Sequence, residues 1–278
     1  MQQKDLGLCG VGIGLRPCHY AYIEKEHPDS NWFEVLSDNY LCEGGASLTH
    51  LEKVRSTYPI TLHGVGMSLG STDPVNMDYL KKLKSLIKFT EPYLVSDHLC
   101  WTSHDGNYFH ELLPLPYTEE AIMHVANRIK LTQDYLEQQI MIENVSSYLS
   151  FNHSTLTEWN FLQTVAEEAD CLILLDINNI YVSSHNNEFN PYTYLTELNT
   201  KRVAQFHLAG FEDKGTHLFD SHNAAVHLSV WELFIQAVKK FGSLPTSIEW
   251  DNQIPDFLHL QQEALIAQTF MENYAVSK

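Results

Sequence analysis

The 278-residue sequence has few positive charges and no long apolar run. Lys and Arg number 17 against 35 Asp and Glu, for a formal net charge of −18. Because such a surface repels phosphate backbones and anionic lipid, we expect neither nucleic acid nor a membrane as a partner. A basic or cationic partner, or a metal ion, would instead be attracted. No apolar run approaches the roughly 18 residues that a membrane helix needs.

Cysteine is scarce, and no pair has the CxxC spacing. An odd number of widely spaced cysteines is typical neither of a disulfide framework nor of a cysteine zinc site. This usage favours a reducing compartment, and we expect a cytoplasmic protein with no nucleophilic cysteine. The five residues are Cys9, Cys18, Cys42, Cys100 and Cys171.

Internal repeats and linker-like stretches are also missing, so we expect one domain over residues 1–278. Short apolar runs alternate with longer amphipathic runs, as in βα units with a parallel sheet. The length and the number of runs predict a (β/α)₈ TIM barrel, with an open doubly wound sheet as the alternative. The glycines of GVGIGLR (10–16) lie within the first run and form no GxGxxG, which disfavours a dinucleotide site. The expected strands are Leu8–Leu15, Trp32–Leu36, Ile60–His63, Tyr93–Asp97, Ile140–Glu143, Cys171–Asp176, Val203–His207 and Thr246–Glu249.

Amphipathic helices are predicted between these strands, where apolar residues recur at steps of three and four. Thr118 is expected to cap one of them, because Glu119 and Glu120 follow it in the first turn, where acids suit the helix dipole. The clearest segments are 75–90, 118–136, 226–241 and 256–271.

Six predicted strands end on a side chain that can bind metal or transfer protons. In a barrel these ends converge on the face that carries active sites. A single polar residue at a strand end is as well explained by a helix cap or a loop contact. Six of them together, largely desolvated, would be costly without a cation, and nitrogen and oxygen ligands without sulfur suit Fe, Mn or Zn. The residues are His63, His98, Glu143, Asp176, His207 and Glu249.

A further pair follows the seventh strand, where Asp220 and His222 stand two apart in HLFDSHN. In an extended segment both would face the same side, although the D-x-H spacing alone is more typical of a solvated loop. Eight ligands exceed what one ion with an open position needs, so we expect two or three ions that share bridging carboxylates. We take Glu143 and Glu249 as the bridging candidates and, with Asp176, as the candidate catalytic residues.

Several neighbouring residues remain open to two interpretations. Asn144 and Asn178 either support or bind the metal, or they cap a turn or the backbone. Asp97 should point away from its neighbour His98, which favours a structural or supporting role. Four others near the first two strands are expected either to line a substrate pocket or to make surface salt links, with equal weight. They are Arg16, His19, Glu34 and Asp38.

Ordered motifs over nearly the whole chain resemble the multinuclear non-haem iron-dependent oxidative enzymes, a family long known only as an uncharacterised domain. The motifs are GIGLR (12–16), HGVGMSLGS (63–71), SDHLCW (96–101), LLPLPYTEEA (112–121), IENVSSY (142–148), LLDINNIYV (174–182), FHLAG (206–210) and IEWD (248–251). One departure is Asp38 in SDN, where the family pattern has Glu, and we assign no metal role there.

The resemblance implies a xylose-isomerase-like barrel that holds two or three iron ions by the eight ligands named above. It implies use of O₂ to modify cysteine in a small ribosomally made precursor peptide, usually with a partner protein that delivers the peptide. The set of motifs is most similar to the branch associated with cysteine-rich, copper-related precursor peptides.

Other functions fit the same fold. A metal-dependent hydrolase or endonuclease and a sugar isomerase are alternatives on the same barrel, although the negative charge disfavours a DNA substrate. A metal-binding protein without catalysis is a third alternative. Metal content, together with O₂ consumption in the presence of a peptide, would distinguish these functions.

Overall fold

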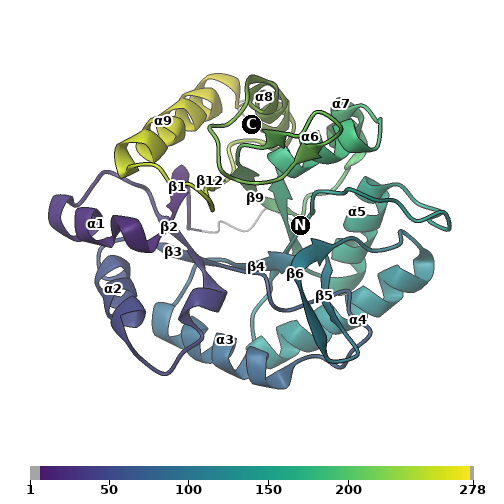
Figure 1. The fold of residues 1–278 in the computed structure, drawn as a ribbon, viewed down its shortest axis with the longest axis horizontal. Coiled ribbons are helices and arrows are strands. Elements are labelled where there is room, and N and C mark those ends of the chain that lie inside the picture. Colours follow the sequence, from purple (N-terminus) through teal and green to yellow (C-terminus); the bar gives the residue numbers. More distant parts are fainter. Residues whose placement is uncertain (1–6, 276–278) are drawn as a thin grey trace.

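A computed structural model describes residues 7–275, which form a closed barrel of eight parallel strands inside a ring of helices (Figure 1). This confirms the predicted (β/α)₈ barrel and excludes the open sheet. All eight predicted strands are present, although the first begins only at Val11. In barrel order they are β1 (Val11–Gly14), β2 (Phe33–Leu36), β3 (Ile60–Gly64), β4 (Val95–His98), β7 (Met141–Glu143), β8 (Leu172–Asp176), β9 (Val203–Leu208) and β12 (Thr246–Ile248), which pairs with β1.

The helices pack around the outside of the barrel. The four segments predicted most clearly are present as α3 (Met77–Thr90), α4 (Glu119–Leu136), α8 (Leu228–Phe241) and α9 (Phe257–Tyr274). Thr118 caps α4 as expected, since its side chain accepts a hydrogen bond from the Ala121 amide at 3.2 Å. The other helices are α1 (Tyr20–Glu26), α2 (Ala46–Arg55), α5 (Glu158–Ala169), α6 (Ile177–Asn186) and α7 (Pro191–Glu197), with 3₁₀ turns at Pro17–His19 and Ser37–Tyr40.

A hairpin that we did not predict follows β4 and lies in front of the barrel in Figure 1. It consists of β5 (Trp101–His104) and β6 (Asn107–Leu113), joined by Asp105 and Gly106 with φ of 50° and 71°. Positive φ at both central residues is typical of a type I′ turn, and Asp-Gly is its usual sequence. The signal was therefore present in SHDGN. A second small antiparallel pair, β10 (Glu212–Asp213) and β11 (Leu218–Phe219), follows β9.

The amino-terminal end of the barrel is filled by an apolar cluster, which we call the floor. Gly12 on β1 leaves room for the Trp32 ring, because a Cβ at this position would lie 2.3 Å from that ring. The floor consists of Leu8, Trp32, Leu94, Met141, Leu174 and Ala204, all buried.

A polar layer lies above the floor. Four of its five residues lie two positions before a candidate ligand on the same strand, so their side chains point inward as the ligand does. The fifth, Glu34, pairs with one of these four on the neighbouring strand and also points inward. The polar layer consists of Glu34, Thr61, Ser96, Gln205 and Ser247, all at most 4% exposed. The barrel thus changes from apolar to polar toward the end where the candidate ligands lie.

Within residues 7–275 no helix is both long enough and apolar enough to span a membrane. The five cysteines are free, with Cys100 and Cys171 buried and the other three exposed.

Glu158, the first residue of α5, makes stability depend on pH. Burial raises the pKa of its carboxyl from 4.5 to about 7, although the Tyr117 and Tyr194 hydroxyls partly oppose this. The folded state therefore binds this proton more tightly than the unfolded state, and stability falls as pH rises from 4.5 to 7. We expect Glu158→Gln to remove up to about 3 kcal/mol of this decline.

Urea unfolding of the variant and the parent at pH 5 and pH 8 measures this difference. Glu168→Gln, on the exposed side of the same helix, is the matched control and should leave the pH dependence as it is. Equal declines in parent and Glu158→Gln would contradict the prediction.

Candidate metal centre

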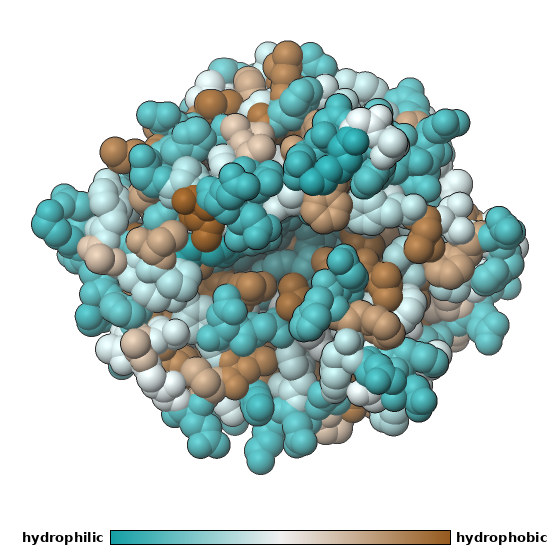
Figure 2. Space-filling view, viewed as in Figure 1, coloured by the Kyte–Doolittle hydropathy of each residue, from teal (hydrophilic) through white to brown (hydrophobic). Residues whose placement is uncertain are grey.

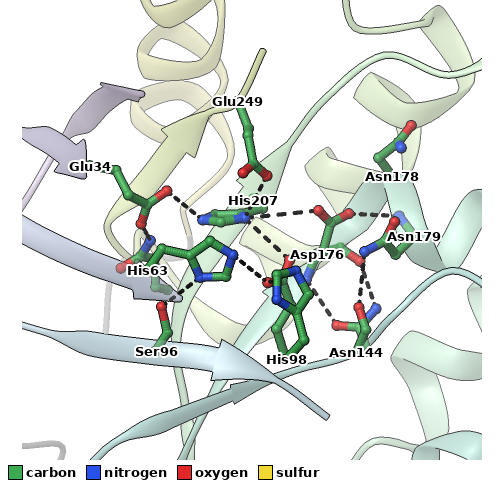
Figure 3. Close-up of polar contacts among 12 residues, drawn as sticks. Glu34, His63, Ser96, His98, Asn144, Asp176, Asn178, Asn179, His207 and Glu249 are labelled. Atoms are coloured by element: carbon green, nitrogen blue, oxygen red, sulfur yellow. Dashed lines mark hydrogen bonds and ion pairs between the residues drawn. The ribbon is translucent and has the colours of Figure 1, made fainter. Parts of the chain in front are cut away.

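The six predicted strand-end residues lie together at the carboxyl end of the barrel. The strand register pairs His98 with Glu143 and Asp176 with His207, so each pair projects to the same side of the sheet. Figure 2 shows a hollow across the middle of this face, bordered by both apolar and hydrophilic residues. Figure 3 shows the convergence of His63, His98, Asp176, His207 and Glu249.

Glu143 is at the centre of the group. Its Oε2 lies 3.2 Å from Nε2 of His63 and 3.2 Å from Nε2 of His98. Its Oε1 lies 3.2 Å from Nδ1 of His207. The carboxylate is 1% exposed, so it is removed from bulk water and faces these imidazoles instead.

His207 links Glu143 to two further carboxylates. Its Nδ1 lies 3.1 Å from Glu249 Oε2 and 4.0 Å from Asp176 Oδ2. Asp176 also caps α6, because its Oδ1 accepts from the Asn179 amide at 2.6 Å. Only the other oxygen of Asp176 is therefore left to face the cluster.

The Asp220–His222 pair joins the same centre through Glu249. His222 Nε2 lies 2.6 Å from Asp220 Oδ1, and its Nδ1 lies 3.4 Å from Glu249 Oε2. Asp251 Oδ2 is a further neighbour, 3.1 Å from the same nitrogen. We did not predict Asp251, although it stands two residues after Glu249, which is the spacing that drew attention to Asp220 and His222.

Hydrogen bonds fix the tautomers of His63 and His98. The Ser96 hydroxyl donates to the Leu62 carbonyl, so its oxygen accepts from Nδ1–H of His63 at 2.8 Å. The Gly64 carbonyl can only accept, and it lies 3.0 Å from Nδ1 of His98. In both neutral rings the Nε2 lone pair therefore points toward Glu143.

A metal ion fits this arrangement. Imidazole lone pairs face carboxylate oxygens at 3.2 Å, which is repulsive unless a cation or a proton lies among them. Four of the buried atoms that face one another have no hydrogen-bond partner among the described residues. They are His63 Nε2, Glu143 Oε2, Asp176 Oδ2 and His207 Nδ1.

The donor atoms form several overlapping sets that could each hold an ion. Within a set all donor atoms lie within 4.8 Å of one another. Glu143 belongs to two sets and Glu249 to three, which is consistent with the predicted bridging role, although that role stays a prediction. The sets are His63–His98–Glu143, Glu143–Asp176–His207–Glu249, His63–His207–Glu249 and His222–Glu249–Asp251.

The pKa values of the centre show where protons lie when no cation is bound. Burial raises the pKa of Asp176, and repulsion from Glu143 raises it further, well above its ordinary value. Burial lowers the pKa of His207, but attraction to Glu34 and Glu143 outweighs burial and raises it well above its ordinary value. Protons thus neutralise part of the cluster, and binding of a cation would release them.

The two asparagines make hydrogen bonds that position the candidate ligands. Asn144 Oδ1 accepts from the Asp176 amide at 2.9 Å, and its Nδ2 donates to the Asp176 carbonyl at 3.0 Å. Asn178 Nδ2 donates to Asp220 Oδ1 at 2.8 Å. Asn144 therefore ties the ends of β7 and β8 together, and Asn178 orients a candidate ligand.

Arg16 and His19 are buried, and Arg16 forms an ion pair with Asp251, whose side chain is 40% exposed. Arg16 Nη2 lies 2.5 Å from Asp251 Oδ1, and its Nε donates to the Trp250 carbonyl at 3.0 Å. His19 Nε2 donates to the Pro255 carbonyl at 2.9 Å. Arg16 thus acts on the centre through Asp251, and His19 holds the loop after β12.

The expectation that Glu34 could make a surface salt link was wrong. Its side chain is 4% exposed and lies inside the barrel, with Oε1 2.7 Å from Nε2 of His207. The sequence did contain a signal for this position, because Glu34 is the one charged residue within the apolar run of β2. In a strand that is buried on both faces, such a charge must point to the barrel axis.

Asp38 is half-buried and accepts from the Val65 amide at 3.0 Å, which holds the loop after β3. Asp97 supports the backbone as expected, since it accepts from the amides of His98 and Met67.

Comparison with known proteins identifies the family. The family described as "RiPP precursor modification enzyme MbnB/TglH/ChrH" matches residues 10–272, where RiPP denotes a ribosomally made, post-translationally modified peptide. The chain belongs to this family. This confirms the assignment from the sequence motifs and makes the protein a member of a family of enzymes that modify precursor peptides.

Relatives named only as UPF0276 proteins share much of the sequence. One from Acaryochloris marina is 53% identical over 262 residues, covering 94% of this chain and 95% of its own. One from Caulobacter vibrioides is 45% identical over 260 residues, covering 93% of each chain.

Solved structures share the xylose-isomerase-like barrel of this family member. A 3-keto-D-glucoside 4-epimerase from E. coli has a TM-score of 0.60 at 14% identity, covering 94% of this chain and 99% of its own. Endonuclease IV from Thermus thermophilus has a TM-score of 0.62 at 11% identity, covering 95% and 99%. At these identities the likeness concerns the fold alone.

Proposed function

We propose that this protein uses iron and O₂ to oxidise cysteine side chains in a small ribosomally made precursor peptide. The observation that carries the proposal is the buried cluster at the barrel mouth, where imidazole lone pairs face carboxylates, in a chain of the RiPP-modifying family. Nitrogen and oxygen donors without sulfur suit iron. Bound iron would supply the electron transfer to O₂ that amino-acid side chains do not perform.

Together, the overlapping donor sets would bind two or three ions. His63, His98 and Glu143 would hold one, and Asp176, His207 and Glu249 would hold a second together with the shared Glu143. His222, Glu249 and Asp251 would hold a third, with Asp220 beside them. The fourth set, His63–His207–Glu249, overlaps the first two.

The protein itself would position the cysteine side chain and enclose the metal centre. The floor closes the barrel below the centre, so the cysteine side chain has to enter from the hollow at the carboxyl end. The buried carboxylates hold the negative charge that would attract the ions. We further propose that a small partner protein delivers the peptide to this face.

The proposal predicts a loss of hydrogen mass, localised to cysteine, in a candidate precursor incubated with the iron-loaded enzyme, its partner protein and air. O₂ consumption should accompany this loss. Mass spectrometry of the digested peptide together with an oxygen electrode measures both, and candidate peptides are those encoded beside the gene of this protein.

Three controls sharpen the experiment: an anaerobic reaction, a zinc-loaded enzyme and a peptide with Cys→Ser at each position. None of the three should lose mass. An unchanged mass for every candidate peptide, despite a filled iron centre and the partner, would favour a hydrolase or a non-catalytic metal-binding protein instead.

A further inference from the structure

Below the candidate ligands, Glu34 places a carboxylate directly against the His207 ring (Figure 3). Its Oε2 accepts from Gln205 Nε2 at 2.6 Å and from Thr61 Oγ1 at 3.2 Å. Its Oε1 lies 2.7 Å from His207 Nε2. Glu34 belongs to none of the donor sets around the centre.

The short contact identifies the nitrogen of His207 that carries a proton. A lone pair on Nε2 would repel a carboxylate oxygen at 2.7 Å, so the proton lies on Nε2. Within residues 7–275, Nε2 makes no hydrogen bond of regular geometry, and Glu34 is the carboxylate that it faces as an ion pair. In the neutral ring the lone pair is therefore on Nδ1, which faces Glu143 at 3.2 Å and Glu249 at 3.1 Å.

His207 differs in this respect from the other two histidines. His63 and His98 present Nε2 to the centre, and their Nδ1 atoms have uncharged partners, a serine hydroxyl and a backbone carbonyl. His207 presents Nδ1, and its other nitrogen faces a carboxylate. A carboxylate partner makes an imidazole a stronger electron donor and fixes the orientation of its ring.

We propose that Glu34 is a positioning residue that directs His207 to bind metal through Nδ1 and makes it the strongest nitrogen donor of the centre. This inference rests on the proposed function only in that the cluster must hold metal ions. Partners of this kind change metal affinity by about 10- to 100-fold.

Titration with Co²⁺ alone tests the inference without the enzymatic reaction. Glu34→Gln keeps an oxygen that can accept from Nε2–H but removes the charge, whereas Glu34→Leu leaves Nε2–H without an acceptor. We expect one class of bound Co²⁺ to weaken by about 10-fold in Glu34→Gln and by about 100-fold in Glu34→Leu. The visible absorption bands of this Co²⁺ should also shift, which general loosening of the fold would not produce.

Thr61→Val is the matched control, because it removes a neighbour of Glu34 Oε2 and leaves the contact with His207 in place. Its affinity and absorption bands should equal those of the parent. Parent-like affinity and bands in Glu34→Leu, or an equal loss in Thr61→Val, would overturn the inference. If Glu34→Leu does not fold, Glu34→Gln decides by the same two readouts. A parent protein that binds no metal would instead refute the proposed function.

Discussion

Replacing Glu143 by Gln should reduce peptide modification by about 10³-fold or more and lower the number of bound ions. Glu143 contacts His63, His98 and His207 at 3.2 Å each, so its charge serves two of the donor sets. The Gln side chain has nearly the same shape as Glu143 but lacks the negative charge that the bound cations would share. The barrel should stay folded, because the ligands lie above the packed core. Rates by mass spectrometry, metal content by elemental analysis and circular dichroism measure the three effects.

Glu249→Gln should behave in the same way, because Glu249 belongs to three donor sets. Glu158→Gln is the matched control: it makes the same change at a buried carboxylate outside every donor set, and metal content and activity should stay at the parent level. A Glu143→Gln protein with full metal content and more than about 10% of parent activity would show that this carboxylate is dispensable, against the shared-ligand argument.

Anaerobic loading with Fe²⁺ should give about two or more irons per chain and raise the melting temperature by about 8–16 °C for one saturated site, and by more for two. The donor atoms come from different strands and converge only in the folded barrel, so bound ions stabilise the folded state. Saturation at about 1,000 times Kd contributes about 4 kcal/mol, and 1 kcal/mol shifts Tm by about 2–4 °C in a chain of this size. Differential scanning calorimetry and elemental analysis of the same sample check both values.

A chelator should reverse the shift, and His63→Ala, which removes one donor from two sets, should reduce it. Zinc and copper have to be kept out, because they bind such ligands more tightly than Fe²⁺. An unchanged Tm with one iron or fewer after loading would mean that the cluster is an acidic pocket stabilised by protons.

The sequence predicted which side chains meet at the carboxyl end of the barrel, because these residues stand at strand ends. Parallel strands of a barrel bring their carboxyl ends together, so His63 and His98 were placed without knowledge of any contact. Glu34 was misjudged because it lies within a strand, where its inward direction is clear only once both faces of β2 are known to be buried. The tautomers could not be predicted, because they depend on partners such as Ser96 and the Gly64 carbonyl, which other strands supply.

The hairpin after β4 shows a different limit. Its turn is local and was recognisable, but β6 is largely exposed and lacks the apolar alternation that marks a half-buried strand. Elements that build the barrel bury side chains and leave a periodic pattern, whereas elements that only frame its entrance do not.

The floor of the barrel also imposes an order of assembly. Trp32 and its apolar neighbours fill the amino-terminal end, so the proposed ions and peptide would enter through the same opening at the carboxyl end. A peptide seated over the centre would close the route by which ions arrive and leave. In the proposed reaction, metallation would therefore precede capture of the peptide, and exchange of bound metal should nearly stop while the peptide is in place.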